Sequence, residues 1–324
     1  MTVYPRSAYP VEWAGTQNNL GTAWSKLPSG DEGENLQNAI DCYTAALAVY
    51  TQSAYPVEWA ATQNNLGVAW SDLPTGDKGE NLQKAMACYI AALTVRTRSA
   101  YPVEWAATQN NLGAAWRDLL AGDKGENLQK AIECYTAALT VYTRSAYPAD
   151  WAMTQNNLGT AWSDLPTDDK GENLQKAFDC YTAALTVYTQ SAYPADWAMT
   201  QNNLGIVWRK LPTGDEGENI QKAIDCYTAA LIVYTRSAYP AKWAMTQCNL
   251  SVAYYCLAEL PGQDRCELYR RAIACMKGAL TIRTPKAFPY EYATSTEALS
   301  IMRDLYDSSA CAKAVPFNEI APAK

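Results

Sequence analysis

Tryptophan recurs along this chain at a fixed interval, and that interval constrains the fold more than any other feature. Neighbouring members of each series are 46 residues apart; the series are Trp13, Trp59, Trp105, Trp151, Trp197 and Trp243, and Trp24, Trp70, Trp116, Trp162 and Trp208. The second unit (53–98) and the third (99–144) differ at only eight positions. Self-similarity at a period of about 20 to 50 residues is typical of solenoids, propellers and repeat arrays.

The composition follows from this repetition and excludes several classes of function. The 324 residues include 11 Trp and 22 Tyr but only 3 Phe and no His. A chain without His forms no Ser-His-Asp triad and no His-containing zinc site, so we expect no enzyme activity, metal or cofactor. The net charge of −7 argues against a nucleic-acid partner. No apolar run approaches the roughly 20 residues that span a bilayer, and the N-terminus does not resemble a signal peptide, so we expect a cytoplasmic protein without a membrane partner.

Each unit has the pattern of two helices. Trp13, Leu20 and Trp24 share one helical face, and a second apolar stripe with a spacing of 3.6 covers residues 36–50. Because no segment alternates with period two, the sequence predicts an all-α fold of antiparallel helix pairs, each helix about 16 to 18 residues long. A Pro-Thr-Gly-Asp turn joins the two helices of a unit.

The start of each second helix carries an Asp-x-x-Glu pattern. An Asp at the N-cap accepts a hydrogen bond from the backbone N–H three residues later, and a Glu at that position completes a capping box. The pattern recurs five times, as Asp31/Glu34, Asp77/Glu80, Asp123/Glu126, Asp169/Glu172 and Asp215/Glu218. We therefore expect five capped second helices.

Stacking of the units must complete the core, because one helix pair cannot bury both of its apolar stripes. We predict six repeats over residues 7–282, with the sixth degenerate, a capping helix within 283–306 and a flexible tail over 307–324. A glycine inside a helix costs about 1 kcal/mol relative to alanine. The glycines in the first helices are therefore expected to permit close packing; they are Gly21, Gly67, Gly113, Gly159 and Gly205.

The unit resembles the tetratricopeptide repeat (TPR). The matching residues of the second unit are Leu66, Gly67 and Trp70 in the first helix, and Ala85, Tyr89 and Ala92 in the second. The run from Asn64 to Gly67 is similar to the longer repeats of kinesin light chain and of bacterial arrays, those of cyanobacteria especially. The resemblance covers residues from about 7 to 306. It implies a right-handed α-solenoid whose first helices line a concave groove.

The Gln-Asn-Asn triplet is the main candidate for a binding feature, because Asn is a poor helix former and two occur in mid-helix in five units. Resemblance to kinesin light chain implies that the first Asn of each pair faces the groove, where its amide can bind an extended peptide backbone. These residues are Asn18, Asn64, Asn110, Asn156 and Asn202. For Gln17 and its equivalents we favour the alternative, a structural ladder of hydrogen bonds between repeats.

Two further sets of candidates differ between repeats. The position one turn before the Asn is small in the first three units and Met in the next three, including Met153 and Met199. A position near the end of the first helix is Arg117 in the third unit and Arg209 in the fifth. Met side chains adapt to varied peptide surfaces. Drift on a tolerant surface would produce the same differences.

The ten cysteines are expected to be reduced thiols in a cytosolic protein. Those spaced by 46 residues lie one layer apart, beyond the distance that a disulfide spans, and Cys248, Cys256, Cys266 and Cys311 show no Cys-x-x-Cys spacing.

Three hypotheses for function follow. The first is a non-enzymatic scaffold that binds a peptide or protein partner in its concave groove. The second is a structural protein that assembles head-to-tail into a homo-oligomer or filament through its N-terminal repeat. The third is the sensor arm of a bacterial signalling system whose effector is a separate protein.

Overall fold

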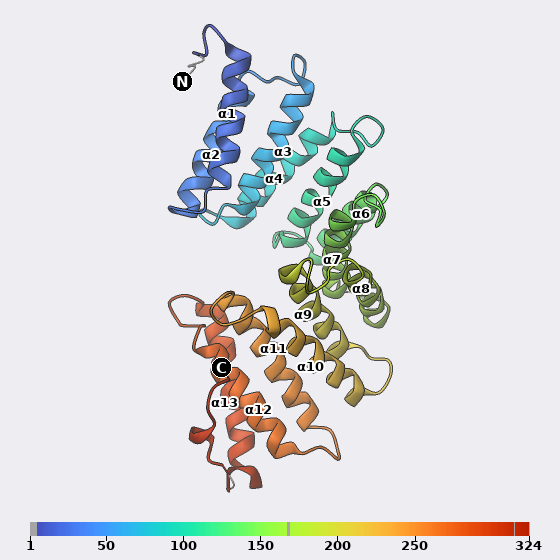
Figure 1. Cartoon of the computed structure of the whole chain (residues 1–324), viewed down its shortest axis with the longest axis vertical. Helices are drawn as coiled ribbons and strands as arrows, with labels where there is room; N and C mark the ends of the chain where they lie inside the picture. Colours follow the sequence, from blue (N-terminus) through green and yellow to red (C-terminus); the bar gives the residue numbers. More distant parts are fainter. Residues whose placement is uncertain (1–4, 167–168, 314, 324) are drawn as a thin grey trace. The chain divides into compact units, whose positions relative to one another are not determined.

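The structure is a computed structural model that describes residues 5–166, 169–313 and 315–323. The described residues form α-helices and two short 3₁₀ helices, and no strand occurs among them, so the predicted all-α class is confirmed (Figure 1). The helices are α1 (Pro10–Ser25), α2 (Glu32–Leu47), α3 (Pro56–Asp72), α4 (Lys78–Leu93), α5 (Pro102–Asp118), α6 (Lys124–Leu139), α7 (Pro148–Asp164), α8 (Lys170–Leu185), α9 (Pro194–Lys210), α10 (Glu216–Val233), α11 (Pro240–Ala258), α12 (Arg265–Leu280), α13 (Pro289–Asp307), η1 (Ala310–Lys313) and η2 (Phe317–Glu319).

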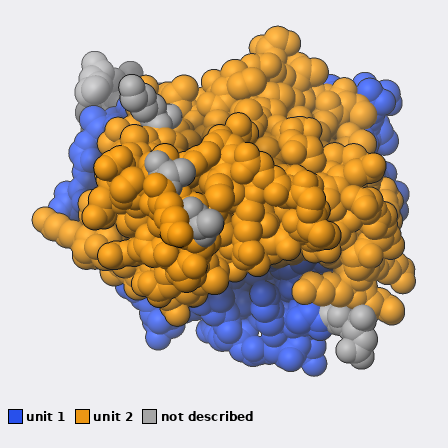
Figure 2. Space-filling model, turned by 90° about the horizontal axis from the view of Figure 1, so that it is seen from below, with its two compact units in different colours: residues 1–168 blue, residues 169–324 orange. Residues whose placement is uncertain are grey.

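The chain divides into two compact units, Met1–Asp168 and Asp169–Lys324 (Figure 2). Unit 1 contains α1 to α7, and unit 2 contains α8 to α13 with η1 and η2. Within each unit, helices that follow one another in sequence pack as hairpins, and each hairpin packs on the next. This sequential packing is that of a solenoid, as the 46-residue period predicts. The handedness of the stack remains a prediction.

The predicted caps are present at four of the five second helices. In the first, the backbone N–H of Glu34 donates to Asp31 Oδ1 across 2.9 Å. The turn before each of these four caps contains a glycine with φ between +81° and +90°, a conformation that residues with a Cβ rarely adopt. At the fifth, α8 begins after Asp169 without a side-chain cap, so that part of the prediction is wrong. The sequence has Asp168 in place of the turn glycine there; residues 167–168 lie outside the described part.

A tyrosine from each second helix lies against the glycine of its first helix. A Cβ added to Gly67 would stand 2.6 Å from Cε1 of Tyr89, whose side chain is 2% exposed. The same relation holds at Gly21, Gly113 and Gly205. The glycines therefore let the two helices of a repeat approach closely, as the sequence predicts.

Except for Trp243, which is 3% exposed, the tryptophans are less buried than their helical spacing indicates. Trp70 and Trp116 are half-buried, and a lysine from the adjoining second helix lies over each ring, with Lys84 Nζ and Lys130 Nζ both 4.3 Å from the ring centroids. The lysine covers the ring face that packing leaves open, in a cation–π contact. The tyrosines at the Tyr89 position, rather than the tryptophans, are the largest fully buried side chains.

Helix α13 covers most of the range 283–306 in which a capping helix is predicted, and its capping role stays a prediction. The described residues after it contact α12 and α13. Cys311 and Ile320 are buried, Lys277 Nζ donates to the carbonyl oxygens of Phe317 (2.7 Å) and Ile320 (3.0 Å), and a disulfide joins Cys311 to Cys266. The described residues of the segment expected to be flexible thus contact α12 and α13. The expectation that all cysteines are reduced is wrong for this pair, and the cysteines no longer support a cytoplasmic location, since disulfides are rare in the cytosol.

Candidate partner-binding face

The asparagines of the first helices form a ladder of hydrogen bonds between successive repeats. In unit 1, Asn64 Oδ1 accepts from Asn111 Nδ2 across 3.3 Å and from Thr108 Oγ1 across 3.1 Å. The same arrangement joins the first and second repeats, where Asn18 Oδ1 accepts from Asn65 Nδ2 and from Thr62 Oγ1. Two further bonds of the same kind join Asn157 to Asn110 in unit 1 and Asn249 to Asn202 in unit 2. The ladder fixes the register of neighbouring first helices.

The contact with a bound peptide expected of the first Asn of each pair remains a prediction, and the burial of these side chains differs between repeats. Asn18 and Asn64 are half-buried, but Asn110, Asn156 and Asn202 are only 5%, 3% and 1% exposed. The asparagines form a structural ladder of the kind that we expected of Gln17 and its equivalents, because the first helix of the next repeat covers the helical face on which they lie.

Sequence reasoning missed the other half of the ladder. The donors are the second Asn of the triplet, such as Asn111, and the Thr that directly precedes the triplet, such as Thr108. Both residues recur with the 46-residue period. They are separated from the acceptor by 47 and 44 residues, and this spacing is the sequence signal that could have indicated a bond between successive repeats.

The methionines are accessible, as expected. Successive first helices contact one another, α1 with α3, α3 with α5 and α5 with α7 in unit 1, and α9 with α11 in unit 2. Equivalent positions on these helices are occupied by Gly15, Ala61, Ala107 and Met153 in unit 1, and by Met199 and Met245 in unit 2; we call them the first-helix face of each unit. Met153 and Met245 are 38% and 37% exposed, and Met199 is half-buried.

The two arginines are not free cations on this face. Arg117 is half-buried and forms an ion pair with its neighbour, Nε to Asp118 Oδ1 at 2.8 Å. Arg209 is half-buried, and its charge lowers the pKa of Tyr227 and Cys256, while burial raises both pKa values more strongly. The Nε of Arg209 is buried without a hydrogen-bond partner in the described structure. The contact with a partner expected of both arginines remains a prediction.

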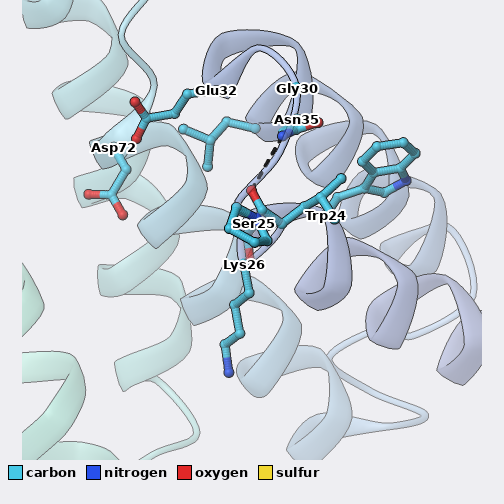
Figure 3. A pocket seen from close by; sticks show the side chains of 10 residues that line it. Trp24, Ser25, Lys26, Gly30, Glu32, Asn35 and Asp72 are labelled. Carbon is cyan, nitrogen blue, oxygen red and sulfur yellow. Dashed lines mark hydrogen bonds between the residues drawn. The ribbon is translucent and has the colours of Figure 1, made fainter.

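A cavity of about 350 Å³ lies at the turn between α1 and α2, where α3 ends (Figure 3). Glu32 and Asp72 lie on one side of it, and Lys26 points away. Burial raises the pKa of Asp72, and Glu32 raises it further, while Lys78 lowers it. Asn35 Nδ2 donates to the carbonyl oxygen of Ser29 across 2.9 Å, so this side chain holds the turn.

No helix in the described part of the chain is long and apolar enough to cross a membrane. Among residues 5–166, 169–313 and 315–323, no three or more His, Cys, Asp or Glu side chains are grouped so that they could hold a metal ion.

Comparisons with known proteins find no match in sequence but do find a match in structure. No protein-family model matches the sequence, and a search of curated proteins finds no match. Among solved structures, one described as "Assembly Chaperone of RpL4 (Acl4) (Residues 1-338)" is similar over 91% of this chain and 99% of that chain, with a TM-score of 0.47 and 14% sequence identity. At this level of similarity, nothing about the function of this chain follows from the match.

Proposed function

We propose that this chain is a non-enzymatic scaffold of TPR type that binds a peptide or protein partner along the first-helix face. The observation that carries the proposal is the contrast between two rows on the same helices. The Asn ladder is constant from repeat to repeat and holds the first helices in register. The partly exposed row beside it changes from Gly15 and Ala61, which are half-buried, to Met153, which is 38% exposed.

A fixed frame with variable exposed positions suits recognition of an extended partner, because each repeat offers a different side chain at the same interval. In unit 1 the row becomes larger and more apolar toward α7. Met side chains at its end can repack around different apolar groups of a partner.

A selection from a library of random 12-residue peptides displayed on phage tests this function. Peptides that bind the native chain should lose at least tenfold in affinity for Met153→Glu, because a carboxylate replaces an apolar contact. The matched control is Ile90→Glu, which makes the same change at a residue of α4 that is 53% exposed. Enrichment of no peptide, or an equal loss of affinity in both variants, would overturn the proposal.

Self-association is the second candidate, and one observation favours it. Leu20 of α1 is 42% exposed, whereas its equivalents Leu66 and Leu112 are 8% and 7% exposed, because the preceding repeat covers them. In the head-to-tail form of this hypothesis, a second helix of another copy would cover Leu20. Sedimentation velocity of the native chain and of Leu20→Glu decides it: a monomer at all concentrations in both proteins excludes self-association.

A further inference from the structure

One position of the repeat is tyrosine in four repeats and arginine in two. It lies at or just after the C-terminal end of the second helix and is occupied in turn by Tyr50, Arg96, Tyr142, Tyr188, Tyr234 and Arg283. The last interval is three residues longer because of the insertion in the sixth repeat. The Arg96/Tyr142 pair is one of the eight differences between the second and third repeats, so the two side chains can be compared in repeats that are otherwise nearly identical.

The tyrosine at this position fills a defined space. Tyr50 is 6% exposed, its hydroxyl donates to the carbonyl oxygen of Val11 across 3.3 Å, and its ring centroid lies 5.7 Å from that of Tyr55. The hydroxyl also lies 3.1 Å from the place where a Cβ on Gly15 would be. The hydroxyl and ring contacts recur for Tyr142, with Val103 and Tyr147, and for Tyr234, with Ala195 and Tyr239.

Where arginine replaces the tyrosine, the same space is a pocket. A cavity of about 200 Å³ in unit 1 is lined by Val57, Ala61, Val95, Arg96, Tyr101 and Glu104. Val57, Ala61 and Tyr101 are the equivalents of Val11, Gly15 and Tyr55, which contact Tyr50. A second cavity, of about 170 Å³, lies in unit 2 and is lined by Ala241, Met245, Arg283, Phe288 and Glu291, which occupy the same positions of the repeat.

The guanidinium groups donate hydrogen bonds to residues that do not line the pockets. Arg96 Nη1 donates to Thr108 Oγ1 across 3.1 Å, and Arg283 Nη1 donates to Ser295 Oγ across 2.9 Å; Thr108 and Ser295 are equivalent residues. Both arginines are thus held toward the next first helix. They line the space of the missing ring and leave it open.

We propose that each pocket receives the phenol ring of a tyrosine from the bound partner. This inference rests on the proposed function, because Ala61 and Met245 belong both to the pockets and to the first-helix face. The ring takes the place that Tyr50 occupies in its own repeat, packs against Tyr101 or Phe288, and meets the guanidinium in a cation–π contact. The hydroxyl donates to the carbonyl oxygen of Val57 or Ala241, as the chain's own tyrosines do at the equivalent residues.

The chemistry of the walls favours this occupant over the alternatives. An acidic side chain would approach Arg96 but would also meet the carboxylate of Glu104 and the apolar side chains of Val57 and Val95. A phenylalanine would fill the same volume without the hydrogen bond to the carbonyl oxygen. Of these three kinds of side chain, tyrosine is the one that satisfies the apolar walls, the cation and the acceptor together.

Saturation-transfer NMR with p-cresol, which reproduces the tyrosine side chain, tests the inference without any partner. We expect saturable binding to the native chain, two- to tenfold weaker binding of toluene, and no displacement by propionate. The variant Arg96→Tyr/Arg283→Tyr fills both pockets with the chain's own rings and should lose at least fivefold in p-cresol signal while unfolding at a higher temperature. Arg98→Tyr, the same exchange at an exposed residue outside the pocket, should leave the signal unchanged.

A gain of function completes the test. Introducing Tyr142→Arg into the filled variant should open one new pocket and restore p-cresol binding. Binding that persists in the filled variant, displacement by propionate, or no saturable binding to the native chain would each overturn the inference. None of these outcomes bears on the loss of peptide affinity in Met153→Glu, so failure here and failure of the proposed function are distinguishable.

Discussion

Asn111 Nδ2 donates to Asn64 Oδ1 across 3.3 Å, and this bond joins the first helices of two successive repeats. Thr108 Oγ1 donates to the same oxygen, so one amide group of α3 holds two side chains of α5. The ladder built from such contacts is the constant element against which the exposed side chains of the repeats vary.

Removal of the acceptor should lower stability. In Asn64→Ala, the half-buried amide of Asn111 loses its acceptor. The hydroxyl of Thr108 has one hydrogen, which it shares between Asn64 Oδ1 and the carbonyl oxygen of Glu104, so in the variant it donates to the carbonyl oxygen alone. We expect a loss of about 1–2 kcal/mol in the free energy of unfolding, measured by urea denaturation. Asn19→Ala is the matched control, since Asn19 is the exposed equivalent of Asn111 in the first repeat, and it should change stability by less than about 0.5 kcal/mol. Equal effects in the two variants would contradict a structural role for the ladder.

Close packing of helices makes Gly67 intolerant of a side chain. In Gly67→Ala, the new Cβ would overlap the ring of Tyr89, which is enclosed by the core and cannot move away freely. Overpacking of this kind costs typically about 1–3 kcal/mol, which outweighs the gain of about 1 kcal/mol in helix propensity. Gly79→Ala adds the same group where it meets only the carboxylate of Asp77, at 3.1 Å, and serves as the control in thermal unfolding. A melting temperature for Gly67→Ala at or above that of Gly79→Ala would show that the interpretation is wrong.

The half-buried thiols should make the fold sensitive to alkali. Burial raises the pKa of the Cys88 and Cys134 thiols from 9.0 to about 11. Because the unfolded chain ionises first, their contribution to stability is complete below pH 9 and is lost as the pH rises toward 11. In Cys88→Ala/Cys134→Ala, the melting temperature should therefore fall less between pH 8.5 and pH 11 than in the native chain. Between pH 6 and 8 the two proteins should show the same pH dependence; an identical alkaline decline in both would argue against this account.

The disulfide should control access to the C-terminal segment. In Cys311→Ser the segment keeps its two hydrogen bonds to Lys277 but loses its covalent link to α12, so it should open more often. We expect trypsin to cleave after the exposed Lys313 several times faster than in the native chain, as followed by mass spectrometry. Cys256→Ser changes a thiol of α11 that forms no disulfide and is the control. Unchanged cleavage in Cys311→Ser would mean that the Lys277 contacts suffice to hold the segment.

Repetition made the fold predictable. The 46-residue period, the Asp31 cap and the Gly67 contact each recur, so the signal at one position is supported by its equivalents. The orientation of Asn64 was not predictable from a single helix, because a helical wheel gives the direction of a side chain but not the neighbour that covers it. The bond between Cys266 and Cys311 was missed because both lie in the degenerate C-terminal part, where no repeat supplies a comparison.

The pockets beside Arg96 and Arg283 were likewise not predictable from the sequence alone. The exchange of tyrosine for arginine is visible in the sequence, but its meaning depends on what surrounds Tyr50. Only the structure shows that the ring occupies a closed space and that the arginine leaves this space empty.

Photo-crosslinking tests most directly the claim that a partner binds along the first-helix face. A photoreactive benzoylphenylalanine placed at Ala107 should form a covalent product with a peptide selected on the native chain, and the same residue placed at Ile90, on a second helix, should form none. The account predicts crosslinking at Ala107 alone. Crosslinking at Ile90 without crosslinking at Ala107 would contradict it.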